Sequence, residues 1–134
     1  MRTFVDTSAL FALVDEQDQN HDRAVAWFVG PASAPSEILL THSYVVVESA
    51  ALINRRLGRD PVRVFLEAIL PATTVLYVDE VLHRFGVAAY LATGSRRASL
   101  VDAVSFEMMR EQQVDRAFAF DRDFAAAGFE LVPG

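Results

Sequence analysis

Four acidic residues stand at positions from which they could hold a divalent metal ion together: Asp6, Glu48, Asp102 and Asp121. They are far apart in the sequence, but three of them come at the end of an expected strand or in the first turn of the next helix. Because ligands of open α/β sheets bind outside the carboxyl ends of the strands, a parallel sheet would gather these carboxylates at one edge. Crowded carboxylates stay ionised together only when a cation compensates their charge. The pattern therefore predicts metal-dependent phosphodiester chemistry.

Three of the four acidic residues also have a purely local interpretation. Asp6 could cap the first helix, and Asp102 could form a capping box with Ser99. Asp121 could cap a short helix or form an Asx-turn. These interpretations stay open for each residue alone, but four coincidental caps explain the joint pattern less well than one shared site does.

Glu48 lies in an expected helix that is apolar on every side. One stripe of this helix is formed by Val46, Ala50, Ile53 and Leu57, and Val45, Ala51 and Leu52 flank Glu48 on the other side. A helix that is apolar all round is expected to be buried. A buried carboxylate is costly unless it is paired or coordinates a metal ion. The alternative to a metal ligand is an ion pair with an arginine such as Arg55.

Short strands alternate with helices along the chain, which predicts a single α/β domain over residues 1–134 with a central parallel five-stranded sheet flanked by helices. The expected strands cover residues 3–5, 38–40, 74–78, 117–120 and 129–131. The expected helices cover residues 8–14, 20–29, 43–57, 61–70, 79–92, 100–113 and 122–127. Gly58 and Gly94 are expected to end the third and fifth of these helices.

Composition narrows the chemistry further. The 134 residues are 52% hydrophobic and 22% charged, which is typical of one folded domain. The chain has no cysteine, and its three histidines, His21, His42 and His83, lack metal-ligand spacing. All twelve basic residues are arginine, which excludes Walker-type phosphate loops and Schiff-base chemistry. The net charge of −6 includes the four clustered acids, so it neither supports nor excludes a nucleic-acid substrate.

The sequence does not predict a membrane protein. It has no run of 18 apolar residues, and Arg2 is followed so soon by Asp6 that an apolar signal-peptide core does not fit. A cytoplasmic location is expected.

The acidic positions resemble the signature of PIN-domain ribonucleases, and among these the VapC toxins of prokaryotic toxin–antitoxin pairs. The resemblance rests on Asp6-Thr7-Ser8, the lone helical Glu48, Ser99-Leu100-Val101-Asp102-Ala103 and Phe120-Asp121-Arg122-Asp123-Phe124. It extends from Asp6 to about Gly128, with the motifs in order and at family-like spacing. One departure is Ala119, near which many relatives have a polar residue.

The resemblance implies a metal-dependent endoribonuclease in which Asp6, Glu48, Asp102 and Asp121 are both the catalytic residues and the ligands of one or two Mg²⁺ or Mn²⁺ ions. Such ions prefer oxygen ligands. They would lower the pKa of bound water and stabilise charge on the leaving oxygen, so that no general base from the protein is required.

Five further residues are expected to assist this site. Ser8 could orient a carboxylate or a phosphate, although an ordinary serine in the first turn of a helix is an equal alternative. Asp123 is expected to assist the metal ligands and ranks below Asp121. The arginines Arg96, Arg97 and Arg122 are expected to contact RNA phosphates, with a solvated basic loop as the alternative.

The resemblance also implies partners. An antitoxin segment would pack in a groove beside the helices within residues 10–28 and block the acidic site, and the toxin would form a homodimer. RNA would be the substrate, and no membrane is involved.

Other functions remain open at this point. A PIN-domain ribonuclease of RNA processing or decay, without a toxin role, would show the same four motifs. A phosphoacceptor receiver domain needs a lysine that the chain lacks, and a haloacid-dehalogenase-like phosphatase needs a second aspartate where Ser8 stands. A non-catalytic RNA-binding module does not explain why all four acids are present.

Overall fold

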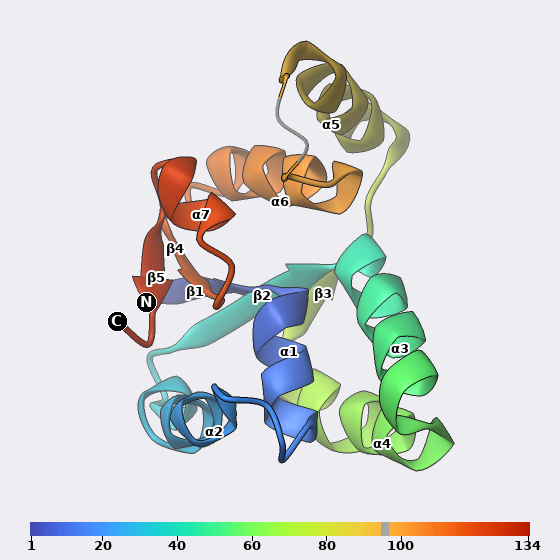
Figure 1. The fold of residues 1–134 in the computed structure, drawn as a ribbon. Coiled ribbons are helices and arrows are strands. Elements are labelled where there is room, and N and C mark those ends of the chain that lie inside the picture. Colours follow the sequence, from blue (N-terminus) through green and yellow to red (C-terminus); the bar gives the residue numbers. More distant parts are fainter. Residues whose placement is uncertain (95–96) are drawn as a thin grey trace.

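Five parallel strands form one sheet in the computed structural model, which describes residues 1–94 and 97–134 (Figure 1). The strands are β1 (Arg2–Val5), β2 (Ile38–His42), β3 (Thr74–Leu76), β4 (Arg116–Phe118) and β5 (Glu130–Val132). Their order in the sheet is β3-β2-β1-β4-β5, and each neighbouring pair is parallel. The α/β class and the five-stranded parallel sheet expected from the sequence are confirmed.

Helices cover both faces of this sheet. They are α1 (Thr7–Val14), α2 (His21–Val29), α3 (Ser43–Leu57), α4 (Arg59–Val64), α5 (Glu80–Ala92), α6 (Leu100–Glu111) and α7 (Asp123–Ala126). Figure 1 shows α1 to α4 on one side of the sheet and α5 to α7 on the other. This division follows from the strand order, because right-handed crossovers place helices on opposite faces when the direction of strand addition reverses.

The reversal occurs between β1 and β4, which are neighbours in the sheet but lie at opposite ends of the sequence. Their pairing continues past the end of β1, where the Asp6 N–H donates to the Phe118 carbonyl at 3.0 Å. A reversal of strand order leaves a crevice at the carboxyl ends of the two strands, which is the usual ligand site of open α/β sheets. Asp6 follows β1 at this point, and Asp121 comes three residues after β4 ends.

The strands are short and apolar because side chains pack against them from both faces. On one face, the Trp27 ring of α2 lies 4.5 Å from the Phe118 ring, measured between centroids. The Phe124 ring of α7 stacks at 5.9 Å on Phe4 of β1. All four side chains are buried, so β1 and β4 are anchored on the sides of the sheet that carry α2 and α7.

His42 links the end of β2 to both helix layers. Its Nδ1 accepts a hydrogen bond from the Val45 N–H, so Nε2 carries the proton and donates to the Ser105 hydroxyl of α6 at 2.8 Å. Burial lowers the pKa of His42 to about 4, which keeps the ring neutral. The sequence suggested no metal-ligand spacing for this histidine, and the structure gives it a structural role.

Helix α5 packs on α6 and projects away from the sheet (Figure 1). The close approach depends on Gly86, because a Cβ atom there would lie 2.5 Å from Cγ2 of Val104. Gly86 is buried in this contact, whereas Tyr77, Val81, Phe85 and Leu91 on and before α5 are exposed.

Most expected elements are present, with differences at their ends. Helix α4 begins at Arg59 rather than at Pro61, and irregular helical turns continue it to Ala72. Helix α5 ends at Ala92 as expected; its cap is Thr93, whose N–H donates to the Ala89 carbonyl, and Gly94 follows this cap. Gly58 does end α3, with a φ of 98° that favours glycine.

Within the described residues, the structure contains no helix with the length and apolar character needed to cross a membrane.

Candidate active site

Asp6 caps α1 with its own carboxylate. Oδ2 accepts hydrogen bonds from the backbone N–H of Ser8 at 3.1 Å and from its hydroxyl at 2.7 Å. The side chain is buried, with only 4% of the residue exposed. Burial raises the pKa of Asp6 to about 7; the hydrogen bonds from Ser8 oppose this rise, and the charges of Asp102 and Asp121 add to it. Asp102 and Asp121 are therefore the acidic residues whose charges act on Asp6.

Asp102 forms the capping box that was one of its two interpretations. Its carboxylate accepts from the Ser99 N–H at 3.0 Å, while the Ser99 hydroxyl accepts from the Asp102 N–H at 3.1 Å. Burial raises the pKa of Asp102 to about 6, the Ser99 hydrogen bonds oppose the rise, and the charges of Asp121 and Glu48 add to it. Capping thus fixes the carboxylate at the helix start without removing it from its acidic neighbours.

Asp121 lies in the loop between β4 and α7 rather than at the end of the strand itself, which stops at Phe118. Its Oδ1 accepts from the Asp123 N–H at 2.9 Å, as in an Asx-turn. One carboxylate oxygen from each of Asp102, Asp121 and Asp123 lies within 4.8 Å of the other two. Asp123, which the sequence ranked below Asp121, therefore belongs to the same cluster geometrically.

Glu48 lies on α3, and its charge adds to the raised pKa of Asp102, but the expectation that its helix is buried on every side is wrong. The helix is not buried on every side, since Val47 is 68% exposed and Glu48 itself is only partly buried. Among the described residues Glu48 makes no ion pair, with Arg55 or with any other arginine. Instead, its Oε1 accepts a hydrogen bond from the Thr7 hydroxyl at 2.9 Å.

Thr7 and Ser49 orient Glu48, and neither was predicted from the sequence. The buried Ser49 hydroxyl donates to the Thr7 hydroxyl at 3.1 Å, which leaves the Thr7 proton to point at Glu48. The sequence offered one indication of their role, which is that Thr7 directly follows Asp6 and Ser49 directly follows Glu48. Only the packing of α1 against α3 makes the two pairs meet.

Ser8 holds the two halves of the site together. Its hydroxyl donates to Asp6 and accepts from the Phe120 N–H at 2.9 Å. The loop that carries Asp121 is thereby tied to the start of α1. This contact is more than an ordinary helix serine would make.

The three predicted RNA-binding arginines have different surroundings. Nε of Arg97 lies 3.6 Å from the Asp123 carboxylate, so this arginine borders the acidic cluster. Arg122 is exposed beside Asp121. Arg96 lies outside the described residues.

The start of α1, α3, the start of α6 and the loop after β4 surround one region at the carboxyl edge of the sheet (Figure 1). Asp6, Asp102 and Asp121 thus make the local contacts expected of them, and the carboxylates of Asp102 and Asp121 also lie close together. Raised pKa values in two carboxyl groups show that their negative charges are unfavourable without compensation. Closely spaced carboxylate oxygens without sulfur or imidazole neighbours suit a hard divalent cation.

Comparison with known proteins agrees with this geometry. The PIN domain family model matches residues 3–130. The 23S rRNA-specific endonuclease VapC20 of Mycobacterium tuberculosis (strain ATCC 25618 / H37Rv) is 36% identical over 132 residues, and the match covers 96% of each chain.

Solved structures give the same result. A crystal structure of Mycobacterium tuberculosis VapC20 has a TM-score of 0.84 and 34% identity, covering 95% of both chains. FitAcB from Neisseria gonorrhoeae has a TM-score of 0.67 over 98% of this chain and 96% of its own, but its identity of 17% supports the fold alone. The chain thus belongs to the PIN-domain family and is an endoribonuclease toxin of the VapC type.

Proposed function

We propose that this protein hydrolyses ribosomal RNA with the help of Mg²⁺ or Mn²⁺, one or two ions being held by Asp6, Glu48, Asp102 and Asp121. The single observation that carries the metal proposal is the convergence of these carboxylates at the reversal point of the sheet, where burial opposes their negative charge. Asp123 joins the proposed ligand set because its carboxylate lies with those of Asp102 and Asp121.

A divalent ion held by these carboxylates would supply Lewis acidity to the scissile phosphate and would lower the pKa of a bound water. The protein's own contribution is positioning. Ser8 and Thr7 fix the carboxylates of Asp6 and Glu48 through hydrogen bonds, and the capping box fixes Asp102. Such supporting contacts typically change metal affinity or activity by about 10–100-fold when they are lost.

The substrate class is taken from the relative. VapC20 is named a 23S rRNA-specific endonuclease, and its crystal structure is described as that of a toxin that cleaves the sarcin-ricin loop. Because the similarity covers nearly the whole of both chains, we propose a structured region of large-subunit ribosomal RNA as the target. Such a substrate agrees with the cytoplasmic location expected from the sequence.

The test is cleavage of purified ribosomes, with Mg²⁺ or Mn²⁺ and with EDTA, by the wild type and by Asp102→Asn. We expect the variant and the EDTA reaction to lose roughly 100-fold or more in rate, because several kcal/mol of charge stabilisation disappear. Asp115→Asn is the matched control, since Asp115 is exposed and precedes β4 at the opposite edge of the sheet. Cleavage that EDTA leaves unchanged would contradict the metal proposal.

An antitoxin is the proposed protein partner. A hollow of about 320 Å³ lies between α1, α2 and α4 and is lined by Leu13, Val14, Glu16, His21, Asp60, Pro61 and Val64. It lies beside the helices for which the sequence suggested a groove, and its mixed apolar and acidic lining suits an amphipathic segment with basic residues. Binding of an antitoxin would distinguish a toxin from a ribonuclease of RNA processing.

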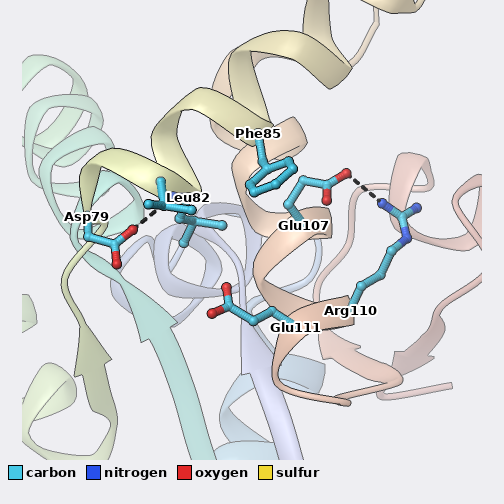
Figure 2. A pocket seen from close by; sticks show the side chains of 7 residues that line it. Asp79, Leu82, Phe85, Glu107, Arg110 and Glu111 are labelled. Carbon is cyan, nitrogen blue, oxygen red and sulfur yellow. Dashed lines mark hydrogen bonds and ion pairs between the residues drawn. The ribbon is translucent and has the colours of Figure 1, made fainter.

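A second copy of the chain is the proposed partner of α5. Val81 and Phe85 are 62% and 61% exposed and lie one helical turn apart, on the same face. Figure 2 shows Phe85 and Leu82 of α5 opposite Glu107, Arg110 and Glu111 of α6. These residues line a depression of about 390 Å³. Exposed apolar side chains beside such a depression are typical of an interaction surface.

A further inference from the structure

A second pocket, distinct from the acidic cluster, opens between the start of α2, the loop after β4 and the end of β5. Its volume is about 420 Å³, within the range of small-ligand sites. It is lined by Gln19, Asn20, Arg23, Ala119, Phe120, Arg122, Ala125, Leu131, Pro133 and Gly134. We call it the Arg23 pocket.

The charge of this pocket is opposite to that of the protein as a whole. The chain carries a net charge of −6, yet the side chains that line the Arg23 pocket include two arginines and no aspartate or glutamate. The hollow beside α4 and the depression beside α5, in contrast, each contain acidic side chains. Arg23 already donates hydrogen bonds at 3.3 Å to the backbone oxygens of Pro133 and Gly134, so the exposed Arg122 is the arginine of this pocket that would meet an anionic group.

Stacking and hydrogen-bonding groups stand next to these arginines. The Arg23 guanidinium lies over the Phe120 ring, 5.5 Å from its centroid. Asn20 precedes α2 as its cap residue, but its side chain makes no capping hydrogen bond and bonds to nothing else in the described part of the chain. A free amide offers donors and acceptors to the edge of a base, and a planar ring offers a stacking surface.

The Arg23 pocket is coupled to the acidic cluster through the loop after β4. Phe120 and Arg122 line the pocket, while the residues between and after them, Asp121 and Asp123, belong to the cluster. The Phe120 N–H is held by the Ser8 hydroxyl, which also binds the Asp6 carboxylate. A nucleotide in the pocket would thus lie one residue away from the carboxylates.

From this arrangement we propose that the Arg23 pocket receives an unpaired nucleotide of the RNA next to the scissile phosphate, with its base against Phe120 and Arg23 and its phosphate near Arg122. The proposal rests on the ribonuclease function and adds a specificity site to it. Arg23, Phe120 and Asn20 become substrate-binding residues that the acidic motif does not include.

Binding is tested without cleavage. The four nucleoside 5′-monophosphates, and inorganic phosphate as a separate probe, are titrated into ¹⁵N-labelled full-length protein in EDTA, and backbone amide shifts are followed by NMR. We expect saturable shifts at Arg23, Phe120 and Leu131 with at least one nucleotide, at concentrations where phosphate gives none. Shifts equal to those of phosphate, or shifts elsewhere only, would overturn the base-binding proposal.

The variants Phe120→Leu and Arg23→Gln each remove one half of the stacking surface. Loss of base stacking is worth about 1–3 kcal/mol, so we expect the nucleotide Kd and the KM for ribosomal RNA to rise roughly tenfold while kcat changes little. Phe120→Tyr keeps the ring and should restore binding. Arg55→Gln is the charge-matched control, because Arg55 is an exposed arginine on α3 that does not line the pocket.

The outcomes separate this proposal from the general function. If ribosomes are cleaved in a metal-dependent way but the pocket variants cleave like the wild type, the pocket proposal fails and the ribonuclease function stands. If nucleotides bind the pocket and no RNA is cleaved, the pocket is a nucleotide site and the ribonuclease function fails. A loss of antitoxin binding in these variants, with unchanged KM, would reassign the pocket to the protein partner.

Discussion

Asp6 serves two purposes that place opposite demands on its charge. As the cap of α1 it only has to accept hydrogen bonds from Ser8, which a neutral amide also does. As a member of the cluster it has to be negative in a buried place beside two other acids, and its pKa is raised to about 7. The site therefore stores an electrostatic cost that a bound cation would relieve.

Replacing Asp6 by Asn should stabilise the metal-free protein at pH 8. The folded-state pKa is above the unfolded value, so protonation favours the folded wild type as the pH falls. The advantage of the variant should shrink below pH 7, by at most roughly 1.4 kcal/mol per pH unit. Urea unfolding of both proteins in EDTA between pH 8 and pH 5 measures this difference, in which other titrating groups largely cancel.

Magnesium supplies the complementary control. At pH 8 it should raise the unfolding free energy of the wild type more than that of Asp6→Asn, because the wild type has the additional carboxylate. If the difference in unfolding free energy between the two proteins stays constant from pH 8 to pH 5, the proposed electrostatic cost of the Asp6 charge is refuted.

At the scale of elements, the α5–α6 contact depends on the absence of one side chain. A Cβ atom on Gly86 would lie 2.5 Å from Cγ2 and 3.2 Å from Cα of the buried Val104. Helix propensity alone would favour alanine at this position by about 1 kcal/mol. The steric conflict with Val104 disfavours alanine at position 86, because one helix has to shift to relieve it.

Gly86→Ala should therefore destabilise the protein by about 1–3 kcal/mol despite its better helix propensity, since extra atoms in a packed contact force side chains or backbone to move. Chemical denaturation measures the net effect, and hydrogen exchange should show faster opening of α5. Val104→Ala combined with Gly86→Ala should recover part of the loss. Gly94→Ala, where an added Cβ meets no atom of the described residues within 4 Å, should have no such effect.

The elements also show how far the sequence could be interpreted. The order of strands and helices could be predicted from the apolar periodicity and from the glycine and proline residues that mark the ends of elements. These local patterns were sufficient to predict a parallel five-stranded sheet. Asp6, Asp102 and Asp121 could be proposed from the sequence because each stands next to an element boundary. The exposure of one side of α3 at Val47 was not predictable, because Val47 and its neighbours are apolar whether or not α3 is covered.

Contacts between elements that are distant in the sequence could not be predicted from the sequence. Thr7 meets Glu48, and Ser8 meets Phe120, only because α1 packs against α3 and β1 pairs with β4. The Arg23 pocket was missed for the same reason, since α2 and the end of β5 are separated by most of the chain.

For the whole molecule, the exposed side of α5 is the surface proposed above for a dimer. Phe85→Glu should convert the proposed dimer into a monomer, because it places a charge in the centre of the apolar surface and adds to the negative charge of Glu107 and Glu111 nearby. Sedimentation velocity at several protein concentrations measures the change. Val29→Glu, at an equally exposed apolar residue at the end of α2, should leave the association state unaltered.

A wild type that sediments as a monomer at every concentration would remove the support for the dimer. No partner would then be assigned to the surface formed by Val81 and Phe85. The acidic cluster would not be affected, because it lies within one chain.

The pairing of β1 with β4 also sets the order in which the site can come into existence during synthesis. Ser8 and Phe120 are 112 positions apart, and Asp121 and Asp123 follow later still. A growing chain exposes Asp6 and Glu48 early, but it has no neighbour for the free edge of β1 until β4 emerges. A growing chain from which β4 and the loop after it have not yet emerged therefore has no assembled site, and it could not cut the ribosomal RNA proposed as its substrate.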